Sequence, residues 1–426
     1  MTTLRAAAAS AEILVSDLPA AADRPQEAPL RATALFIEGD APLCIISCDV
    51  IGLLRDSCDE IAATISQTCR VPFDNVLVTC THTHHAPRPM PVYSTPRIEE
   101  VCARTIAAAV DAAKQARTKL DAAESSGVDM LYALGQEATV GANSRWLMRD
   151  GQISWSHHDE AEMVRPTGPH DPDLPVLAFR RPSGKLAAAL YCHATHNIGT
   201  LHPEPTKVIS PGFFGLAAQE MERRHGAPFL YLAGAFGSSH RRDSHVKGPE
   251  AMTRVVNTVE EALGRLEPMP AAPMISIKRP YTCRYRNFDE AREADGVSRW
   301  VRRWFEPKSA ECLERTYAKV RETMASKAGK TFETWLHVIR LGDLAIVGIP
   351  GEMFAHLGLD IRRRSPFRHT LVVGLANDEI GYIADRKGYE LGGYQTWFCG
   401  HSQVGPGAGE AMVEAVLSLL AEIHAI

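Results

Sequence analysis

Hydrophobic positions in the first part of the chain change from a strand-like to a helical spacing. Two apolar runs, residues 32–37 and 43–51, flank the turn Glu38-Gly39-Asp40, which predicts a β-hairpin of buried strands. Residues 55–69 then place apolar side chains on one helical face, namely Cys58, Ile61, Ala62 and Ile65. A strand, a turn and a helix therefore follow one another within about 40 residues of chain.

The same alternation continues to the end of the chain. Strands are predicted at residues 75–80, 174–179, 187–193, 228–234, 334–341, 344–349 and 370–376, and helices at 98–115, 213–225, 249–265, 352–364 and 407–424. Strands that alternate with helices are typical of an α/β fold, and hairpins at 32–51 and 334–349 make its sheet mixed. We expect one domain over residues 1–426, a large mixed β-sheet layered with α-helices.

A charged segment at residues 287–330 interrupts this alternation. It has helical character, no strand pattern, and the aromatic residues Trp300, Trp304 and Phe305. We interpret it as a helical insertion, which is either a solvated hairpin or a lid whose aromatic side chains face a binding site.

Composition narrows the class of protein. The chain has 426 residues, 45% of them hydrophobic, and a net charge of −5, so it lacks the basic excess of a nucleic-acid-binding surface. Its ten cysteines form no CxxC pair and most lie in apolar stretches, as buried thiols do in a reducing compartment. We find no signal peptide and no apolar run of about 18 residues. We therefore expect a cytoplasmic protein without membrane insertion, and homo-oligomer formation is left open.

Two histidine-bearing segments follow predicted strands. His82 and His84 come directly after the strand at 75–80, and on an extended backbone residues i and i+2 point to the same side. His193 and His196 come at the exit of the strand at 187–193. Imidazole is the commonest metal ligand, although surface pairs and hydrogen-bonded core histidines are the ordinary alternatives.

Two further segments carry an acid and a phenol at strand ends. Glu352 follows Pro350-Gly351 and is expected to open a helix, where an acidic residue also has a purely structural role at the positive end of the helix dipole. Tyr382 follows a Gly-containing turn, and its local sequence alone indicates only packing.

Together and in this order, the four segments resemble the catalytic domain of the neutral, non-lysosomal ceramidase family. The resemblance covers about residues 32–424. Its matching segments are Thr81-His82-Thr83-His84-His85-Ala86-Pro87, His193, Gly348-Ile349-Pro350-Gly351-Glu352 and Asn377-Asp378-Glu379-Ile380-Gly381-Tyr382.

The resemblance implies the ceramidase catalytic-domain fold and one bound Zn²⁺. The implied zinc ligands are His82, His193, Glu352 and Tyr382. It also implies catalytic roles for four other residues: His84 in proton transfer, Tyr394 at the oxyanion, Arg145 near the substrate carbonyl, and His240 in the loop of the family's catalytic serine.

The sequence departs from the family at that loop, which reads Gly237-Ser238-Ser239-His240-Arg241 and has a histidine where ceramidases have serine. The family's immunoglobulin-like domain and secretory signal are also not found. Basic residues at His240, Arg241, Arg242 and His245 suggest a polar or anionic small-molecule substrate, unless they are only a solvated loop.

We therefore expect a zinc-dependent amidohydrolase that cleaves a linear C–N bond of a small polar substrate with metal-activated water. The alternatives are a zinc esterase, lactonase or lyase on the same scaffold, and a non-catalytic metal-binding homologue.

Overall fold

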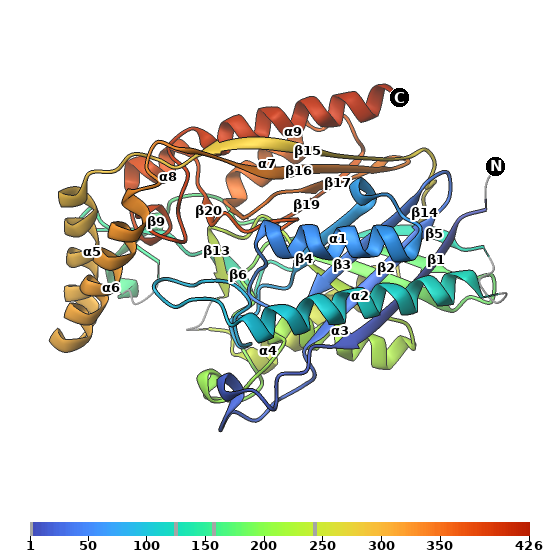
Figure 1. Ribbon diagram of the computed structural model, residues 1–426, viewed down its shortest axis with the longest axis horizontal. Coiled ribbons are helices and arrows are strands. Elements are labelled where there is room, and N and C mark those ends of the chain that lie inside the picture. The colour runs from blue at the N-terminus through green and yellow to red at the C-terminus, as the bar shows by residue number, and fades with distance from the viewer. Residues whose placement is uncertain (1–2, 123–126, 156–158, 242–244) are drawn as a thin grey trace.

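The computed structural model describes residues 3–122, 127–155, 159–241 and 245–426, and it is a mixed α/β structure (Figure 1). Most strands belong to three sheets with the orders β1-β2-β3-β4, β12-β11-β10-β5-β14 and β15-β16-β17-β19. The strands of these sheets are β1 (Arg5–Glu12), β2 (Arg31–Glu38), β3 (Pro42–Cys48), β4 (Val76–Cys80), β5 (Asp129–Gln136), β10 (Asp173–Arg180), β11 (Leu186–His193), β12 (Phe229–Ala233), β14 (Glu267–Pro268), β15 (Met274–Arg284), β16 (Thr331–Leu341), β17 (Leu344–Gly348) and β19 (His369–Val373).

Parallel and antiparallel pairs occur within each of these sheets, which confirms the predicted mixed α/β class. The first sheet joins the antiparallel hairpin β2–β3 to the parallel pair β3–β4, and the third joins β16–β17 to the parallel pair β17–β19. The strands are divided among several sheets, whereas we expected one large sheet. Short strands complete the set: β6 (Gly141–Asn143), β7 (Trp146–Met148), β8 (Ile153–Ser154), β9 (Met163–Pro166), β13 (Ser239–Arg241), β18 (Glu352–Met353) and β20 (Tyr382–Ile383).

The helices lie outside these sheets, most of them against a sheet face and two as a hairpin at one end of the molecule (Figure 1). They are α1 (Arg55–Cys69), α2 (Glu99–Asp121), α3 (Gly212–His225), α4 (Gly248–Leu263), α5 (Glu290–Trp304), α6 (Pro307–Ala325), α7 (Ala355–Arg364), α8 (Arg386–Leu391) and α9 (Ala408–Ala425). Local sequence explains several of the ends. Gly226 ends α3 with a φ of +66°, and the Asp289 side chain accepts a hydrogen bond from the Arg292 N–H at the start of α5.

The three main sheets meet in a common apolar core. Along β1, Ala6 and Ala8 belong to the core between the sheets, whereas Ala7 and Ala9 belong to the core shared with the helices. This division follows from the two-residue period of a strand. In the part of the chain that the structure describes, no helix combines the length and apolar character needed to cross a bilayer.

Helices α5 and α6 stand apart at one end of the molecule, away from both termini (Figure 1). They occupy the charged segment for which two interpretations were open. Trp300 is buried against Trp155, Phe305 and Trp397, so this aromatic side chain joins the hairpin to the body of the protein. The hairpin is thus not fully solvated, and the aromatic side chain of Trp300 packs against the rest of the protein.

Candidate metal centre and cavity

The chain after β4 brings His82 and His84 together. His82 adopts a left-handed φ of +58°, a conformation that costs energy and that is concentrated at functional sites. The backbone here is therefore not extended, as we had expected, but the two Nε2 atoms still converge to 3.1 Å. His82 Nδ1 lies 2.6 Å from the Ile51 carbonyl oxygen, which can only accept, so Nδ1 carries the proton and Nε2 is free to bind a cation.

His196 brings the third imidazole to this point. The residue is buried, and its Nδ1 lies 2.9 Å from the Ser239 carbonyl oxygen, which again leaves Nε2 unprotonated. That Nε2 atom lies 3.0 Å from Glu352 Oε2 and 3.2 Å from the Tyr382 hydroxyl.

His193, which we predicted as a ligand, lies elsewhere. It is the last residue of β11; its Nε2 donates to the Glu137 carbonyl at 3.0 Å, and its ring lies beside His170 and Phe214. The last residue of a buried strand packs between layers, and the loop beyond it reaches the site. His196 therefore replaces His193 in the cluster. The signal for this correction was present in the sequence, because the same segment contains a second histidine three residues further on.

Strand pairing places Glu352 and Tyr382 side by side. The two residues are directly opposite each other in the parallel pair β18–β20. We expected Glu352 to open a helix, but it lies in β18 and the helix α7 begins only at Ala355.

Burial opposes ionisation of Glu352, yet the neighbouring His82 and His196 outweigh the effect of burial and lower the pKa of this carboxyl. Glu352 is thus a buried carboxylate directed at two imidazoles.

The donor set fits a metal cation. The ligand nitrogens of His82, His84 and His196 lie within 4.8 Å of one another. Glu352 Oε2 is buried and makes no hydrogen bond, although it lies 3.0 and 3.7 Å from imidazole nitrogens. Burial lowers the pKa of His82 to about 4, so the imidazole is neutral at neutral pH, which is the form that binds metals. A bound cation would be a common partner for the unpartnered carboxylate oxygen and the neutral imidazoles around it.

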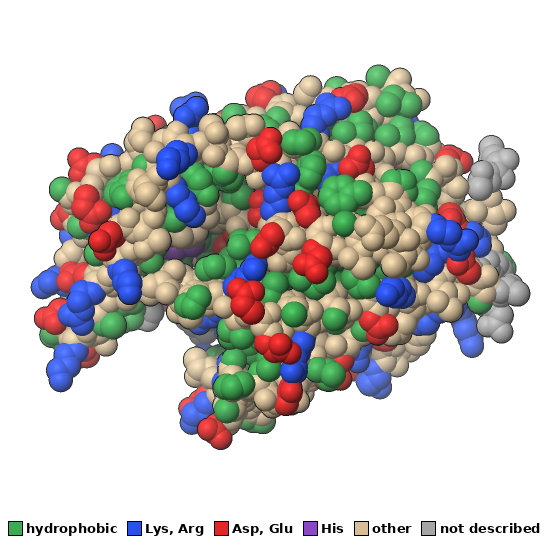
Figure 2. All heavy atoms as spheres, in the orientation of Figure 1, with side chains coloured by type: hydrophobic (Ala, Val, Ile, Leu, Met, Phe, Trp, Pro, Cys, Tyr) green, Lys and Arg blue, Asp and Glu red, His purple; other side chains and the backbone are tan. Residues whose placement is uncertain are grey.

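A cavity of about 730 Å³ opens above this cluster. His82, His84, Glu352 and Tyr382 line it, and residues of α6 form its opposite wall. Figure 2 shows this hollow beside the projecting α5–α6 end, with a histidine surface inside it and Lys or Arg side chains around it. The α6 side chains that line it are Lys319, Val320, Thr323 and Met324, which share one face because they recur at helical spacing, and Lys327 lines it from the turn after the helix.

Tyr394 lies in the cavity wall as predicted for a residue near the reaction. Its hydroxyl forms a short hydrogen bond with the Tyr93 hydroxyl, and its ring stacks on His401 at 4.3 Å between centroids. Tyr93 belongs to the loop after the first histidine pair. Sequence reasoning missed Tyr93 and His401, because neither belongs to a recognisable motif and only the fold brings them to the cavity.

His240 and Arg145 support the site from outside the cavity. The His240 ring stacks on His196 at 3.7 Å, and its Nδ1 lies 2.9 Å from the Ser144 hydroxyl. Arg145 is buried, and its guanidinium donates to Gln395 Oε1 and to the carbonyls of Gly388 and Gly392. We expected Arg145 near a substrate carbonyl, but its side chain is not among those that line the cavity. Arg145 instead holds the backbone that precedes Tyr394.

Arg241 and His245, the described members of the basic group after His240, do not line the cavity. Arg241 donates to the carbonyls of Ile198 and Val246, and His245 contacts Glu160 at 3.2 Å. Arg242 lies outside the described residues. The cations at the cavity are instead Arg88, Lys319 and Lys327, which are exposed and form no ion pair in the described parts of the chain, and Arg55, which pairs with Asp59.

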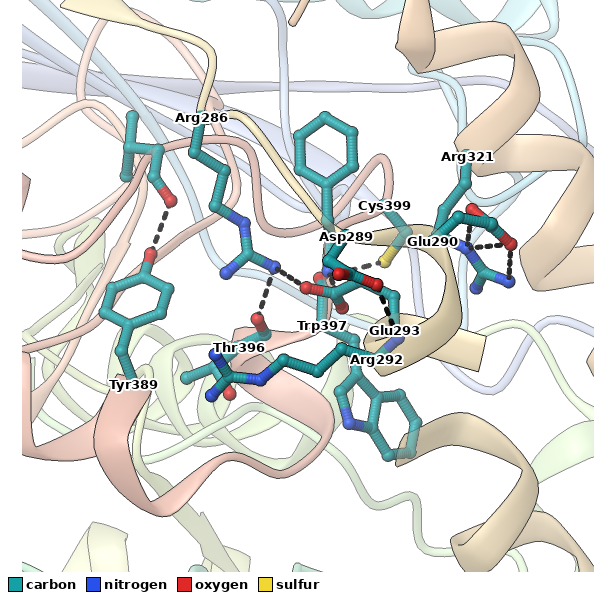
Figure 3. A network of polar contacts seen from close by, with 12 residues as sticks. Arg286, Asp289, Glu290, Arg292, Glu293, Arg321, Tyr389, Thr396, Trp397 and Cys399 are labelled. Carbon is teal, nitrogen blue, oxygen red and sulfur yellow. Dashed lines mark hydrogen bonds and ion pairs between the residues drawn. The ribbon is translucent and has the colours of Figure 1, made fainter. Parts of the chain in front are cut away.

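The α6 wall is fixed to the loop that carries Tyr394 (Figure 3). Arg286 donates to Glu293 Oε1 at 3.1 Å and to the Thr396 carbonyl at 2.6 Å. Glu293 Oε2 accepts from the Phe398 N–H at 2.8 Å. A second ion pair, Arg321–Glu290, joins α6 to α5. These contacts join the hairpin to the body of the protein, where α6 forms one wall of the cavity.

The fold and the site define an α/β protein whose cavity floor could hold a metal ion. No protein-family model and no curated protein sequence matches the chain. Among solved structures, it is similar to neutral ceramidase from Pseudomonas aeruginosa, with a TM-score of 0.73 and 17% identity over 99% of this chain and 75% of that one. A ceramidase complexed with C2 gives a TM-score of 0.74 and 16% identity over 100% of this chain and 76% of that one. The chain therefore has the fold of these ceramidases, as the sequence resemblance predicted.

Proposed function

We propose that this protein is a zinc-dependent hydrolase that cleaves a linear amide bond of a small polar substrate with metal-activated water. The observation that carries the proposal is the convergence of three imidazoles and the unpartnered Glu352 oxygen on the floor of the cavity. Two proteins with this fold are ceramidases, whose name denotes cleavage of an amide.

By the resemblance to ceramidases, the ion would be held by His82, His196, Glu352 and Tyr382, and His84, the third imidazole of the cluster, would lie beside it. A zinc ion held there would supply Lewis acidity and would make a neighbouring water molecule more acidic. The hydrogen bonds from His82 Nδ1 to Ile51 and from His196 Nδ1 to Ser239 keep both Nε2 atoms unprotonated and both rings oriented.

His84 is the imidazole placed to exchange protons with a substrate. His82 and His196 are buried, whereas His84 is exposed to the cavity. The His84 ring reaches solvent only inside the cavity, and desolvation there together with the neighbouring histidines keeps its pKa well below its usual range, so the ring is neutral and can accept a proton from the attacking water. The same ring can then deliver that proton to the leaving amine.

Tyr394 would donate a hydrogen bond to the negative charge that develops on the carbonyl oxygen. Burial and nearby tyrosines keep the pKa of Tyr394 well above its usual range, so its hydroxyl retains its proton. Exposed Arg88, Lys319 and Lys327 at the cavity support a polar substrate rather than a membrane lipid.

The cytoplasmic location stays a prediction. All ten cysteines are free thiols in the structure and nine of them are buried, a state that a reducing compartment maintains.

The proposal is tested by loading the protein with zinc and measuring hydrolysis of matched amide and ester panels. We expect stoichiometric zinc, amide cleavage, and loss of cleavage on chelation that added zinc restores. Ester cleavage without amide cleavage would assign the esterase alternative, and zinc binding without turnover on either panel would assign the non-catalytic one. A His84→Ala variant should keep zinc and lose at least about 100-fold in rate, as expected for a general acid–base residue.

A further inference from the structure

Tyr93 lies at the tip of a tight turn in the cavity wall. Val92 and Thr95 exchange two backbone hydrogen bonds of 3.0 Å, and Tyr93 is the first of the two residues between them. Its φ is +52°, and a first central position with positive φ ordinarily holds glycine. A tyrosine in this conformation costs free energy, and such residues are concentrated at functional sites, which points to a role for the Tyr93 side chain.

The Tyr93 side chain joins two walls of the cavity. It lines the cavity and keeps 38% of its surface exposed. Its ring lies edge-on to Tyr317 of α6 and to His401, at 5.6 and 5.5 Å between centroids, and its hydroxyl is hydrogen-bonded to the Tyr394 hydroxyl. A substrate in the cavity would therefore meet Tyr93 beside Tyr394.

The ring of Tyr394 is held more firmly than the ring of Tyr93. Tyr394 is buried, and its ring stacks on His401 at 4.3 Å and on Trp155 at 4.4 Å between centroids. Stacking fixes the plane of the ring but leaves the direction of the O–H bond open. The direction of the Tyr394 proton therefore depends on the hydrogen bonds of its hydroxyl, and Tyr93 supplies such a bond.

Two phenol hydroxyls that share one hydrogen bond leave one O–H group unused. Burial of the phenol ends raises the pKa of both Tyr93 and Tyr394, so both keep their protons. One proton forms the mutual bond, and no carbonyl or carboxylate oxygen of the described residues accepts the other. The Tyr317 hydroxyl, which also acts on Tyr93 as a hydrogen-bond partner, adds a third proton together with a second bond, so one O–H group is still left for a ligand in the cavity.

The paired hydroxyls belong to the surroundings of the candidate metal centre. The ring centroids of Tyr394 and Tyr382 are 6.0 Å apart, and the Glu352 carboxylate is close enough to add to the effect of burial on the pKa of Tyr93. We propose that Tyr93 is a positioning residue for the proposed hydrolysis: its hydroxyl donates to the Tyr394 oxygen and so directs the Tyr394 O–H group toward the carbonyl oxygen of the substrate. This inference rests on the proposed amide hydrolysis and on the role of Tyr394 in it.

The firmly held ring of Tyr394 favours this direction of the hydrogen bond. A donor to a developing oxyanion has to be oriented before the reaction begins, and Tyr394 is the more rigid and more buried of the two tyrosines. As negative charge builds up on the carbonyl oxygen, the Tyr394 oxygen becomes a better acceptor, so the bond from Tyr93 strengthens. A bond that strengthens in the transition state raises kcat and leaves KM almost unchanged.

The test is a double-mutant cycle on the zinc-loaded protein, with the amide that the wild type cleaves fastest. Tyr394→Phe should lower kcat by about 100-fold or more, as expected for a lost oxyanion donor. Tyr93→Phe should lower kcat by about tenfold with little change in KM. The double variant should have the kcat of Tyr394→Phe to within about a factor of two, because Tyr93 acts through Tyr394.

Tyr389→Phe is the matched control, because it removes the same hydroxyl group from a tyrosine outside the cavity. Tyr389 is buried and donates to the Val404 carbonyl at 2.6 Å. This variant should lower the Tm and keep kcat. Tyr93→Phe should lower kcat with the smaller fall in Tm, because its ring contacts stay and its zinc content is unchanged. A kcat that follows the Tm in both variants would reduce Tyr93 to a structural role and overturn the inference.

An unchanged kcat in Tyr93→Phe would also overturn the inference. Effects of the two single substitutions that multiply in the double variant would do the same, since Tyr93 would then contact the substrate on its own. If the wild type cleaves no amide, the proposed function fails, and the inference is decided by the binding of butanoate, whose carboxylate offers the same acceptor. Its Kd for the zinc-loaded protein should rise about tenfold in Tyr93→Phe and be equal in Tyr394→Phe and the double variant. No binding to the wild type, or a Kd that Tyr93→Phe leaves unchanged, would refute the positioning role.

Discussion

At the scale of single residues, His193 and His196 are three positions apart and have different surroundings. His196 faces Glu352 and Tyr382, whereas His193 faces the Glu137 carbonyl on the other side of β11. A glutamine at either position keeps a side chain that can donate to a carbonyl oxygen. The pair therefore offers a matched test of which imidazole binds the metal.

We expect His196→Gln to lose zinc and activity together, and His193→Gln to keep stoichiometric zinc with a modest loss of stability. Losing one of the protein ligands should weaken metal binding by more than the 10–100-fold typical of a residue that only orients a ligand. Metal content after dialysis, measured by inductively coupled plasma mass spectrometry, checks this. Zinc retained by His196→Gln and lost by His193→Gln would restore the original assignment.

Asp49 predicts a pH dependence of stability away from the candidate metal centre. Burial raises the pKa of Asp49 to about 7, although hydrogen bonds from Arg31 and Thr81 oppose the shift. The unfolded chain releases this proton near pH 4, whereas the folded protein holds it up to about pH 7. The stability that Asp49 contributes is therefore fully present below pH 4 and is lost as the pH rises to 7.

We expect Asp49→Asn to remove this dependence. The free energy of unfolding of the variant, relative to wild type, should rise by up to about 4 kcal/mol between pH 4 and pH 8, because each pKa unit corresponds to about 1.36 kcal/mol. Urea unfolding at several pH values measures this difference. The exposed residue Asp40 provides the control variant Asp40→Asn, which should follow wild type; the same behaviour in Asp49→Asn would contradict the prediction.

At the scale of helices and strands, the sequence predicted most of the regular structure. The helix expected at residues 55–69 is α1, with identical bounds, because its apolar spacing is unambiguous. The strand β1 was missed because its sequence, Arg-Ala-Ala-Ala-Ala-Ser-Ala-Glu, has low strand propensity, and only its pairing with β2 along all eight residues makes it a strand. Which strands share a sheet depends on distant pairing, and the local pattern does not contain that information.

The candidate site was predictable to the extent that a motif marks it. His82, His84, Glu352 and Tyr382 meet as the motifs suggested. Residues that reach the cavity from segments without a motif, such as Glu379 and Tyr93, could be found only from the fold, because their neighbours in space are far away in sequence.

The α5–α6 hairpin gives a prediction that belongs to this scale. Glu293 is 12% exposed at its side chain, pairs with Arg286, and accepts from the Phe398 N–H. Glu293→Gln leaves Arg286 with no partner carboxylate, which should cost about 2–4 kcal/mol of stability. It should also lower activity without loss of metal, because the loop with Tyr394 and His401 loses part of its support.

The matched control is Glu311→Gln on α6, whose side chain is 59% exposed and lies 3.8 Å from Arg315. A pair as exposed as this should contribute at most about 0.5 kcal/mol. Thermal and urea unfolding of both variants, together with their zinc content, test whether Glu293 anchors the hairpin. Equal effects of the two substitutions would show that the hairpin is not anchored through Glu293.

At the scale of the whole molecule, the candidate metal centre joins elements that belong to different sheets. His82 follows β4 in the first sheet, His196 follows β11 in the second, and β18 with Glu352 follows β17 of the third. A cation bound here would therefore link all three main sheets, and its binding free energy would add to the stability of the whole fold.

We accordingly expect zinc to raise the Tm and chelation to lower it. Zinc at 100 times its Kd contributes about 2.7 kcal/mol to the native state, which corresponds to a shift of a few degrees in a protein of this size. Scanning calorimetry with and without a chelator measures the shift, and His196→Gln should show none. A wild-type Tm that does not respond to zinc would argue against a metal bridging the sheets.

The distance along the chain between the candidate ligands also bears on how the protein would acquire the proposed ion in the cell. Its histidines begin at residue 82, but Glu352 and Tyr382 are added late in a chain of 426 residues. A nascent polypeptide that has only the first histidines cannot yet form the complete coordination sphere. Loading of the proposed metal would thus follow translation of most of the message, and a ribosome-bound fragment shorter than about 350 residues should leave zinc in solution.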